Sequence, residues 1–221
     1  MSRAQSSFWR NNGLILVFGL MTLVSLGGQA MAGWHFDTED RQAHGLQAQL
    51  LLEYLGGGEF LSTVFENWES EFLQMGLFVL LTVWLRQKGA SESRPMSSVE
   101  EEPPEAVPLA QQPWPMRQGG VWQRLYEHSL SAALLTLFAV SFVVHWWHSW
   151  RVHAQEQATH NQPVTPMWEY LWGAQFWFES FQNWQSEFLS MIVLCWLSIY
   201  LREKDSPQSK AMTARHSDTG V

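Results

Sequence analysis

The chain contains one 36-residue segment twice. Residues 53–88 and 169–204 align without a gap at an offset of 116 positions, and 17 of the 36 aligned residues are identical. Both copies contain the sequence NWxSEFL and then continue into an apolar stretch. An internal repeat of this kind predicts a fold of two similar units placed in tandem.

Two other segments have the composition of membrane-spanning helices. Residues 13–34 carry no charged side chain, and the only ionisable residues of 129–150 are His145 and His148. Each segment has 22 residues, and about 20 residues of helix cross the roughly 30 Å hydrocarbon core of a bilayer. We therefore expect each segment to cross a membrane.

The apolar stretches that follow NWxSEFL are too short to cross a bilayer alone. Phe72–Leu85 and Phe188–Leu201 have 14 residues each, which is about 21 Å of helix. A crossing helix must therefore include the NWxSEFL segment itself. The sequence predicts such helices at about 66–85 and 182–201.

These four segments predict an all-α fold, an integral membrane four-helix bundle. It consists of two tandem, parallel two-helix repeats, residues 1–88 and 121–204. The outer loops, residues 35–65 and 151–181, mix aromatic and acidic residues. We expect amphipathic helices in these loops, either lying on the membrane or packed on the bundle.

The segments between and after the repeats are polar. Residues 89–120 contain EEEPPEAVP and QPWP, and residues 205–221 are similarly poor in apolar side chains. Such stretches cannot bury enough apolar surface to fold. We predict a disordered cytoplasmic linker and a disordered cytoplasmic tail.

The basic residues indicate the orientation of the helices. Of thirteen Lys and Arg, only Arg41 and Arg151 lie in the outer loops. Because cytoplasmic segments carry the excess of Lys and Arg, both termini are predicted to be cytoplasmic, in a multi-pass protein of the cytoplasmic (inner) membrane. An alternative for residues 1–32, which end in Ala-Met-Ala, is a cleaved signal peptide.

The net charge and the motifs exclude several classes of function. A formal net charge of −8 without a basic aromatic patch argues against nucleic-acid binding. The sequence has no nucleophile motif, no phosphate-binding glycine loop and no HExxH. We therefore expect no enzymatic activity and no cofactor, and we expect the lipid bilayer as the main partner.

Polar residues that both copies keep are the first candidate site. A carboxylate below the membrane interface is costly unless it has a function or a partner. Two such carboxylates across a pseudo-two-fold axis could share a proton or hold a cation. The candidates are Glu71 and Glu187, with Ser70, Ser186, Asn67 and Asn183 beside them and Trp68 and Trp184 as interfacial anchors.

A simpler interpretation of these residues is helix capping. Each Glu would accept backbone N–H groups at the start of its helix, where the helix dipole favours a negative charge. The neighbouring Ser and Asn would complete the cap. Glu66 and Glu69 are replaced by Gln182 and Gln185 in the second copy, so we set them aside as a weak metal signal.

Histidines form the second candidate site. His145 and His148 are three residues apart on one predicted helix, a spacing at which two imidazoles can share a metal. The matching residues of the first copy are Gln29 and Ala32. Because the pair is not repeated, histidines at a membrane interface without any ligand are the competing interpretation.

The repeat resembles a known family. The stretch ENWESEFLQM followed by LFVLLTVWLRQKG, preceded by GxAMAGW and by AHG…EYL, resembles a family of uncharacterised bacterial multi-pass membrane proteins, a domain of unknown function. The resemblance covers nearly all of the chain apart from the linker and the tail. It implies a bacterial inner-membrane protein of four helices and implies no activity or site residue.

Three classes of function remain. The first, which we favour from the sequence, is a non-enzymatic structural or assembly factor. The second is a small proton- or cation-coupled transporter or channel that uses Glu71 and Glu187, for which four helices would require a homodimer. The third is a membrane redox or metal protein that uses His145 and His148.

Overall fold

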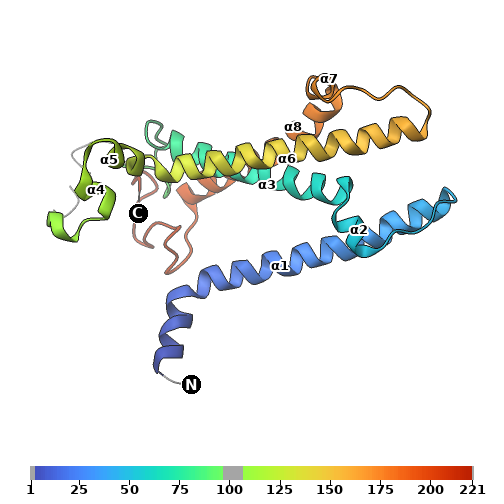
Figure 1. The fold of residues 1–221 in the computed structure, drawn as a ribbon. Helices are drawn as coiled ribbons and strands as arrows, with labels where there is room; N and C mark the ends of the chain where they lie inside the picture. Colours follow the sequence, from blue (N-terminus) through green and yellow to red (C-terminus); the bar gives the residue numbers. More distant parts are fainter. Residues whose placement is uncertain (1–2, 97–106, 221) are drawn as a thin grey trace. The chain divides into compact units, whose positions relative to one another are not determined.

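The computed structural model describes residues 3–96 and 107–220, and these residues form helices and loops without a strand. They divide into two compact units, Met1–Ser62 and Thr63–Val221. The helices (Figure 1) are α1 (Arg3–Ala43), α2 (Leu51–Leu55), α3 (Gly58–Leu81), the 3₁₀ turn Leu109–Gln111, α4 (Trp114–Gln118), α5 (Gly120–Glu127), α6 (Ser129–Thr159), α7 (Met167–Leu171) and α8 (Ala174–Tyr200).

The first unit is a long helix, α1, followed by the short helix α2. Trp34 Nε1 on α1 donates a hydrogen bond of 2.9 Å to the carbonyl oxygen of Gln49, just before α2. Asp37 accepts hydrogen bonds from Arg41 Nε (3.0 Å) and from Gln49 Nε2 (2.7 Å). These contacts fix the loop after α1 against the end of the helix.

Tyr54 of α2 packs directly on Gly33 of α1. A Cβ atom at Gly33 would lie 2.1 Å from the Tyr54 hydroxyl oxygen, which is far inside van der Waals contact. At Gly28, on the same helix, a Cβ would meet no atom within 4 Å. Gly33 is therefore the residue that lets α2 approach α1.

We expect Gly33→Ala to destabilise the chain by about 1–3 kcal/mol, because the added methyl group overpacks the contact with Tyr54. Gly28→Ala is the matched control, and its higher helix propensity should leave stability equal or raise it by up to about 1 kcal/mol. Thermal unfolding in detergent measures both. Equal melting temperatures for the two variants would show that Tyr54 does not dock at Gly33.

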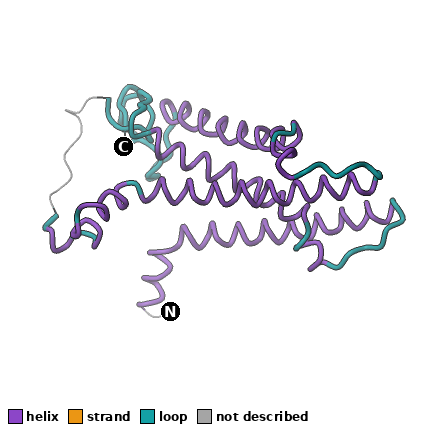
Figure 2. The backbone as a smooth tube through the Cα atoms, turned by 45° about the horizontal axis from the view of Figure 1, so that its top comes forward, coloured by secondary structure: helices purple, strands orange, loops and turns teal. Residues whose placement is uncertain are grey.

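The second unit is built from α3, α6 and α8, which run side by side (Figure 2). Gly76 of α3 lies against Leu134 and Leu135 of α6, so a Cβ there would meet Leu135 at 3.2 Å. Phe142 of α6 packs edge-to-face on Phe176 of α8, with ring centroids 5.4 Å apart. These contacts join the end of the first repeat to the hairpin of the second.

The corner between α6 and α8 repeats a contact of the first unit. Trp150 Nε1 donates a hydrogen bond of 2.9 Å to the carbonyl oxygen of Thr165. Trp150 and Thr165 lie 116 positions after Trp34 and Gln49, which form the same hydrogen bond. The loop after α1 and the loop after α6 are therefore held in the same way.

Helix lengths differ from the sequence prediction. Helices α1 and α6 extend into the expected outer loops, and the loop helices α2 and α7 have only five residues each. Two segments, Asn11–Ala43 and Ser129–Thr159, are long and apolar enough to cross a membrane. The structure thus gives an all-helical fold with two candidate spans, and the prediction of four is not confirmed. In α3 and α8 the glutamates of the repeated segment shorten the apolar part.

The predicted linker and tail contain more structure than expected. Residues 97–106 of the linker lie outside the described residues, and the part that follows forms the 3₁₀ turn and α4. The tail contacts the chain just after α3, where Gly220 N donates to Ala90 O at 3.1 Å. The Lys210 ammonium donates to the carbonyl oxygens of three tail residues, Arg215, His216 and Asp218.

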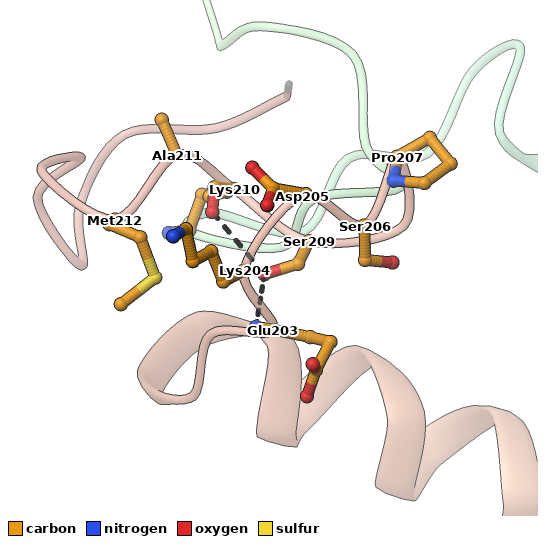
Figure 3. Close-up of a pocket in the computed structure, with 9 residues that line it drawn as sticks. All are labelled: Glu203, Lys204, Asp205, Ser206, Pro207, Ser209, Lys210, Ala211 and Met212. Carbon is orange, nitrogen blue, oxygen red and sulfur yellow. Dashed lines mark hydrogen bonds between the residues drawn. The ribbon is translucent and has the colours of Figure 1, made fainter.

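The start of the tail encloses a small open pocket, drawn in Figure 3. Ser209 Oγ accepts a hydrogen bond of 2.9 Å from the backbone of Glu203 at its base. Acidic, basic, hydroxyl and apolar side chains all line this pocket, without a cluster of one chemical type. Its contacts order the tail locally, and the chemically distinctive residues of the second unit lie elsewhere.

Candidate functional site

The interior of the second unit contains an ionisable pair. Glu69 of α3 and His145 of α6 both have 0% of their surface exposed. Nδ1 of His145 lies 2.8 Å from Oε2 of Glu69. Burying two such groups is expensive in free energy, and an isolated buried ion pair often stabilises a fold less than apolar packing would. The pair is therefore a candidate for a function.

The other ring nitrogen of His145 faces a second carboxylate. Nε2 has no hydrogen-bond partner, and Oε2 of Glu179 on α8 lies 3.5 Å from it. Ser149 Oγ donates to the same Glu179 oxygen at 2.7 Å, and Tyr170 OH lies 2.6 Å from Ser149 Oγ. Since Ser149 has one hydroxyl proton, which points at Glu179, Tyr170 is the donor in the second bond.

Two further side chains tie the cluster across the repeats. Trp184 Nε1 donates a hydrogen bond of 2.9 Å to Oε1 of Glu69. Asn183 Nδ2 donates to Oε1 of Glu66. The carboxylates of these bonds lie on α3, in the first repeat, and the donors lie on α8, in the second. We call Glu69, His145 and Glu179 the buried triad from here on.

Local sequence explains how α6 presents His145. Ser141, His145 and Ser149 are spaced four residues apart, so they lie on one face of the helix, and each is at most 5% exposed. Small residues on such a face let neighbouring helices approach closely. Phe176 of α8, which is 0% exposed, covers the imidazole with ring centroids 5.0 Å apart.

The hydrogen bonds around Glu179 set its charge. Ser149 Oγ and Gln175 Nε2 donate to the two oxygens of Glu179 at 2.7 and 3.3 Å, and hydrogen bonds donated to a carboxylate favour its ionised form. Burial raises the pKa of Tyr170 to about 12. Glu179 is therefore ionised and Tyr170 neutral at physiological pH, which suits the donor and acceptor roles described above.

The buried triad can hold a variable number of protons. A neutral imidazole has one N–H and can donate to one carboxylate, whereas an imidazolium can donate to both. Histidine is also the side chain whose charge changes most readily near neutral pH. An imidazole between two carboxylates can therefore take up or release a proton without any other group entering the site.

The structure brings the predicted carboxylates Glu71 and Glu187 together. Their side chains lie close enough for one carboxyl group to hydrogen-bond to the other. Ser70 and Ser186 do not join them, because each hydroxyl donates to the carbonyl oxygen three residues before it, that of Asn67 or Asn183. Glu71 is exposed, so this pair lies outside the buried triad.

The other predicted residues separate. Trp184 belongs to the triad's surroundings, whereas Trp68 is 38% exposed. His148 is half-buried, and its Nδ1 has no hydrogen-bond partner. Within residues 3–96 and 107–220, no group of three or more His, Cys, Asp and Glu side chains is arranged to hold a metal ion. The structure therefore places His145 with carboxylates and does not join it to His148.

Sequence reasoning missed Glu69 and Glu179. We set Glu69 aside because the second copy has Gln185 at the matching position. All three triad positions differ between the copies, since the first-copy counterparts of His145 and Glu179 are Gln29 and Thr63. The useful signal was thus an ionisable residue in one copy and a neutral one in the other. The residues that both copies share indicated mainly how the chain turns into each helix, and they did not indicate the site.

Fold and site together define the class of protein. The residues that the structure describes form helices without a strand, two of these helices are long and apolar enough to span a membrane, and Glu69, His145 and Glu179 meet between the repeats. The chain belongs to the family described as a domain of unknown function (DUF6766), whose model matches residues 5–221. No curated protein and no solved structure matches the chain.

Proposed function

We propose that the chain is a four-helix membrane protein in which α3 and α8 cross the bilayer, as α1 and α6 do. Helices α3 and α8 have 24 and 27 residues, or about 36 and 40 Å at 1.5 Å per residue. Leu189, Ile192 and Trp196 of α8 are 59–65% exposed. Apolar surface of this extent is rare on a soluble monomer and suits contact with lipid.

The proposed location is the bacterial cytoplasmic membrane, with both termini in the cytoplasm. The distribution of Lys and Arg supports this orientation, because Arg41 and Arg151 are the only basic residues in the outer loops. The buried triad then lies toward the outer end of the bundle, near α7. The two repeats enter the membrane from the same side.

We propose that the protein is not an enzyme and that it acts in proton-coupled transport. One observation carries this proposal: His145, which lies in a helix long and apolar enough to cross a membrane, is fully buried together with Glu69 of α3, and Glu179 of α8 lies at its second ring nitrogen. Ionisable groups at such positions are costly and commonly mark proton or ion pathways. The single charged triad provides one site per chain.

A structural or assembly role is the second candidate. It is favoured by the hydrogen bonds from Trp184 and Asn183 of the second repeat to Glu69 and Glu66 of the first. These bonds would hold the repeats together whether or not a proton moves. In that role the triad would hold the helices together, and its protonation would not drive transport.

Proton flux into liposomes distinguishes the two roles. The purified protein is reconstituted with a pH-sensitive dye inside the vesicles, and flux is recorded after a pH step with a potassium–valinomycin clamp. We expect flux in the wild type and a loss of at least about tenfold in Glu69→Gln and in His145→Gln. Removing one proton-transfer group from a relay typically costs this much or more in rate.

The double variant Glu71→Gln/Glu187→Gln is the control, because it removes the other carboxylate pair and leaves the triad intact. It should keep the wild-type flux. If only this control loses flux, the conducting site is the Glu71–Glu187 pair. A wild type without any flux would leave the structural role as the better account.

A further inference from the structure

Glu179 differs from the other two members of the triad in its access to solvent. Its side chain is 27% exposed, whereas the side chains of Glu69 and His145 are 0% exposed. A proton that reaches the imidazole from outside must therefore pass a group at the edge of the cluster. Glu179 is at that edge and lies opposite Nε2.

Glu66 is the competing route, because it is also only half-buried. Its Oε1 accepts the hydrogen bond from Asn183 of α8. Both ring nitrogens of His145 already face other carboxylates, Nδ1 facing Glu69 and Nε2 facing Glu179. Of the two half-buried carboxylates, Glu179 is the one that lies opposite a ring nitrogen.

We propose that Glu179 is the uptake group through which protons reach the buried His145–Glu69 pair, and that Ser149 and Gln175 are positioning residues that hold its carboxylate beside the imidazole. This inference rests on the proposed function in proton-coupled transport. It assigns a direction to the triad, from the half-exposed carboxylate to the fully buried one.

One proton moves through three groups in this transfer, and the number of protons is conserved at each step. A proton from solvent first converts the Glu179 carboxylate to the acid. The acid then passes it to Nε2 of His145, and the imidazolium releases its Nδ1 proton to Oε2 of Glu69. Glu179 is again a carboxylate, His145 is neutral with its proton on Nε2, and Glu69 is the acid. The proton leaves by the reverse of these steps, from Glu69 to Nδ1 and from Nε2 through Glu179 to solvent, which restores the starting state.

The 3.5 Å gap between Nε2 and Oε2 of Glu179 places a control point at the second step, the transfer from Glu179 to the imidazole. A direct proton transfer needs a hydrogen bond of about 2.6–3.2 Å, so Glu179 must move slightly toward the ring. Ser149 holds Oε2 at 2.7 Å and Gln175 Nε2 lies 3.3 Å from Oε1. These two donors limit the movement and stabilise the ionised carboxylate.

The groups around the triad are consistent with one mobile proton. On α3, the Glu66 carboxyl group accepts a hydrogen bond from Asn183. On α7, Tyr170 is neutral, with its pKa raised by burial to about 12. On α6, the His153 ring stacks on Tyr170 at 5.0 Å and contacts no member of the triad.

The test is the pH profile of proton flux in liposomes. Glu179→Gln, which keeps shape and removes the titrating group, should lose flux at least about tenfold. Ser149→Ala should keep flux but move the midpoint of its pH profile upward by about one unit, because a hydrogen bond to a charged group is lost. The sign follows from the direction of the bond, because Ser149 donates to Glu179 and so favours the carboxylate over the acid.

Glu66→Gln is the matched control, since it removes a half-buried carboxylate of α3 that is not a member of the triad and that accepts its hydrogen bond from Asn183. It should keep at least half of the wild-type flux. Loss of flux in Glu66→Gln with normal flux in Glu179→Gln would overturn the assignment of Glu179 and leave the proposed function standing. A wild type without flux would overturn the proposed function itself.

Ser149→Ala provides a second test of the proposal, and this test does not depend on a loss of flux. An unchanged pH midpoint with wild-type flux would show that Ser149 does not position the uptake carboxylate. Melting temperatures of all variants in detergent identify any that fail to fold. If Glu179→Gln unfolds, Glu179→Asp replaces it, and its shorter carboxylate should slow the flux without abolishing it; wild-type flux in that variant would count against the assignment.

Discussion

Replacement of Glu69 by alanine is expected to lower the free energy of unfolding by about 3–5 kcal/mol, the cost of removing one partner from a buried charged pair. The change leaves His145 Nδ1 and Trp184 Nε1 without acceptors, and both atoms now bond Glu69 at 2.8 and 2.9 Å. Since His145 is 0% exposed, water cannot replace the lost carboxylate without opening the bundle. Thermal or denaturant unfolding in a mild detergent measures the loss.

Glu71→Ala is the control for this prediction. Glu71 lies two residues away on the same helix, is exposed, and faces the like charge of Glu187. Its removal should change stability by less than about 1 kcal/mol. If Glu69→Ala proved as mild as Glu71→Ala, Glu69 would not be a buried partner of His145.

The second large effect is expected at Phe176. This side chain is 0% exposed and packs on His145, Phe142 and Tyr170, with ring centroids 5.0, 5.4 and 6.1 Å away. Truncation to alanine should cost about 3–5 kcal/mol, because it leaves a cavity beside the imidazole. The cavity would also admit water to the triad. The variant should therefore discriminate less well than the wild type between protons and other cations.

Phe178→Ala is the matched control, because Phe178 lies two residues after Phe176 on α8 and is 69% exposed. Its loss should cost less than about 1 kcal/mol. Unfolding experiments on the two variants under one set of conditions give the contrast. Similar losses for Phe176→Ala and Phe178→Ala would mean that α8 does not bury the face that carries Phe176.

The helices were predictable because their signals are long and periodic. The apolar segments 13–34 and 129–150 lie inside α1 and α6, and the two NWxSEFL segments lie in α3 and α8. Helix ends were less predictable, because α1 and α6 continue through polar residues that no proline or glycine interrupts until after Ala43 and Thr159. Polar composition alone does not stop a helix.

The site was less predictable, for a physical reason. Glu69, His145 and Glu179 come from three helices and are 34–110 residues apart in sequence, so only packing brings them together. The repeat offset led us to residues that both copies keep, and Glu71 and Glu187 do lie near each other. The triad breaks the repeat, since its counterparts Gln29, Thr63 and Gln185 are neutral. Similarity between the copies could not point to a site whose residues have no ionisable counterpart in the other copy.

The central claim is that Glu69, His145 and Glu179 carry protons in a membrane, and proton flux in liposomes tests it most directly. The decisive comparison is Glu69→Gln against Glu71→Gln/Glu187→Gln, which remove carboxylates from neighbouring positions of the same helices. The account predicts that Glu69→Gln loses at least about tenfold of the wild-type flux while the double variant keeps it. Full flux in Glu69→Gln, or none in the wild type, would contradict the account.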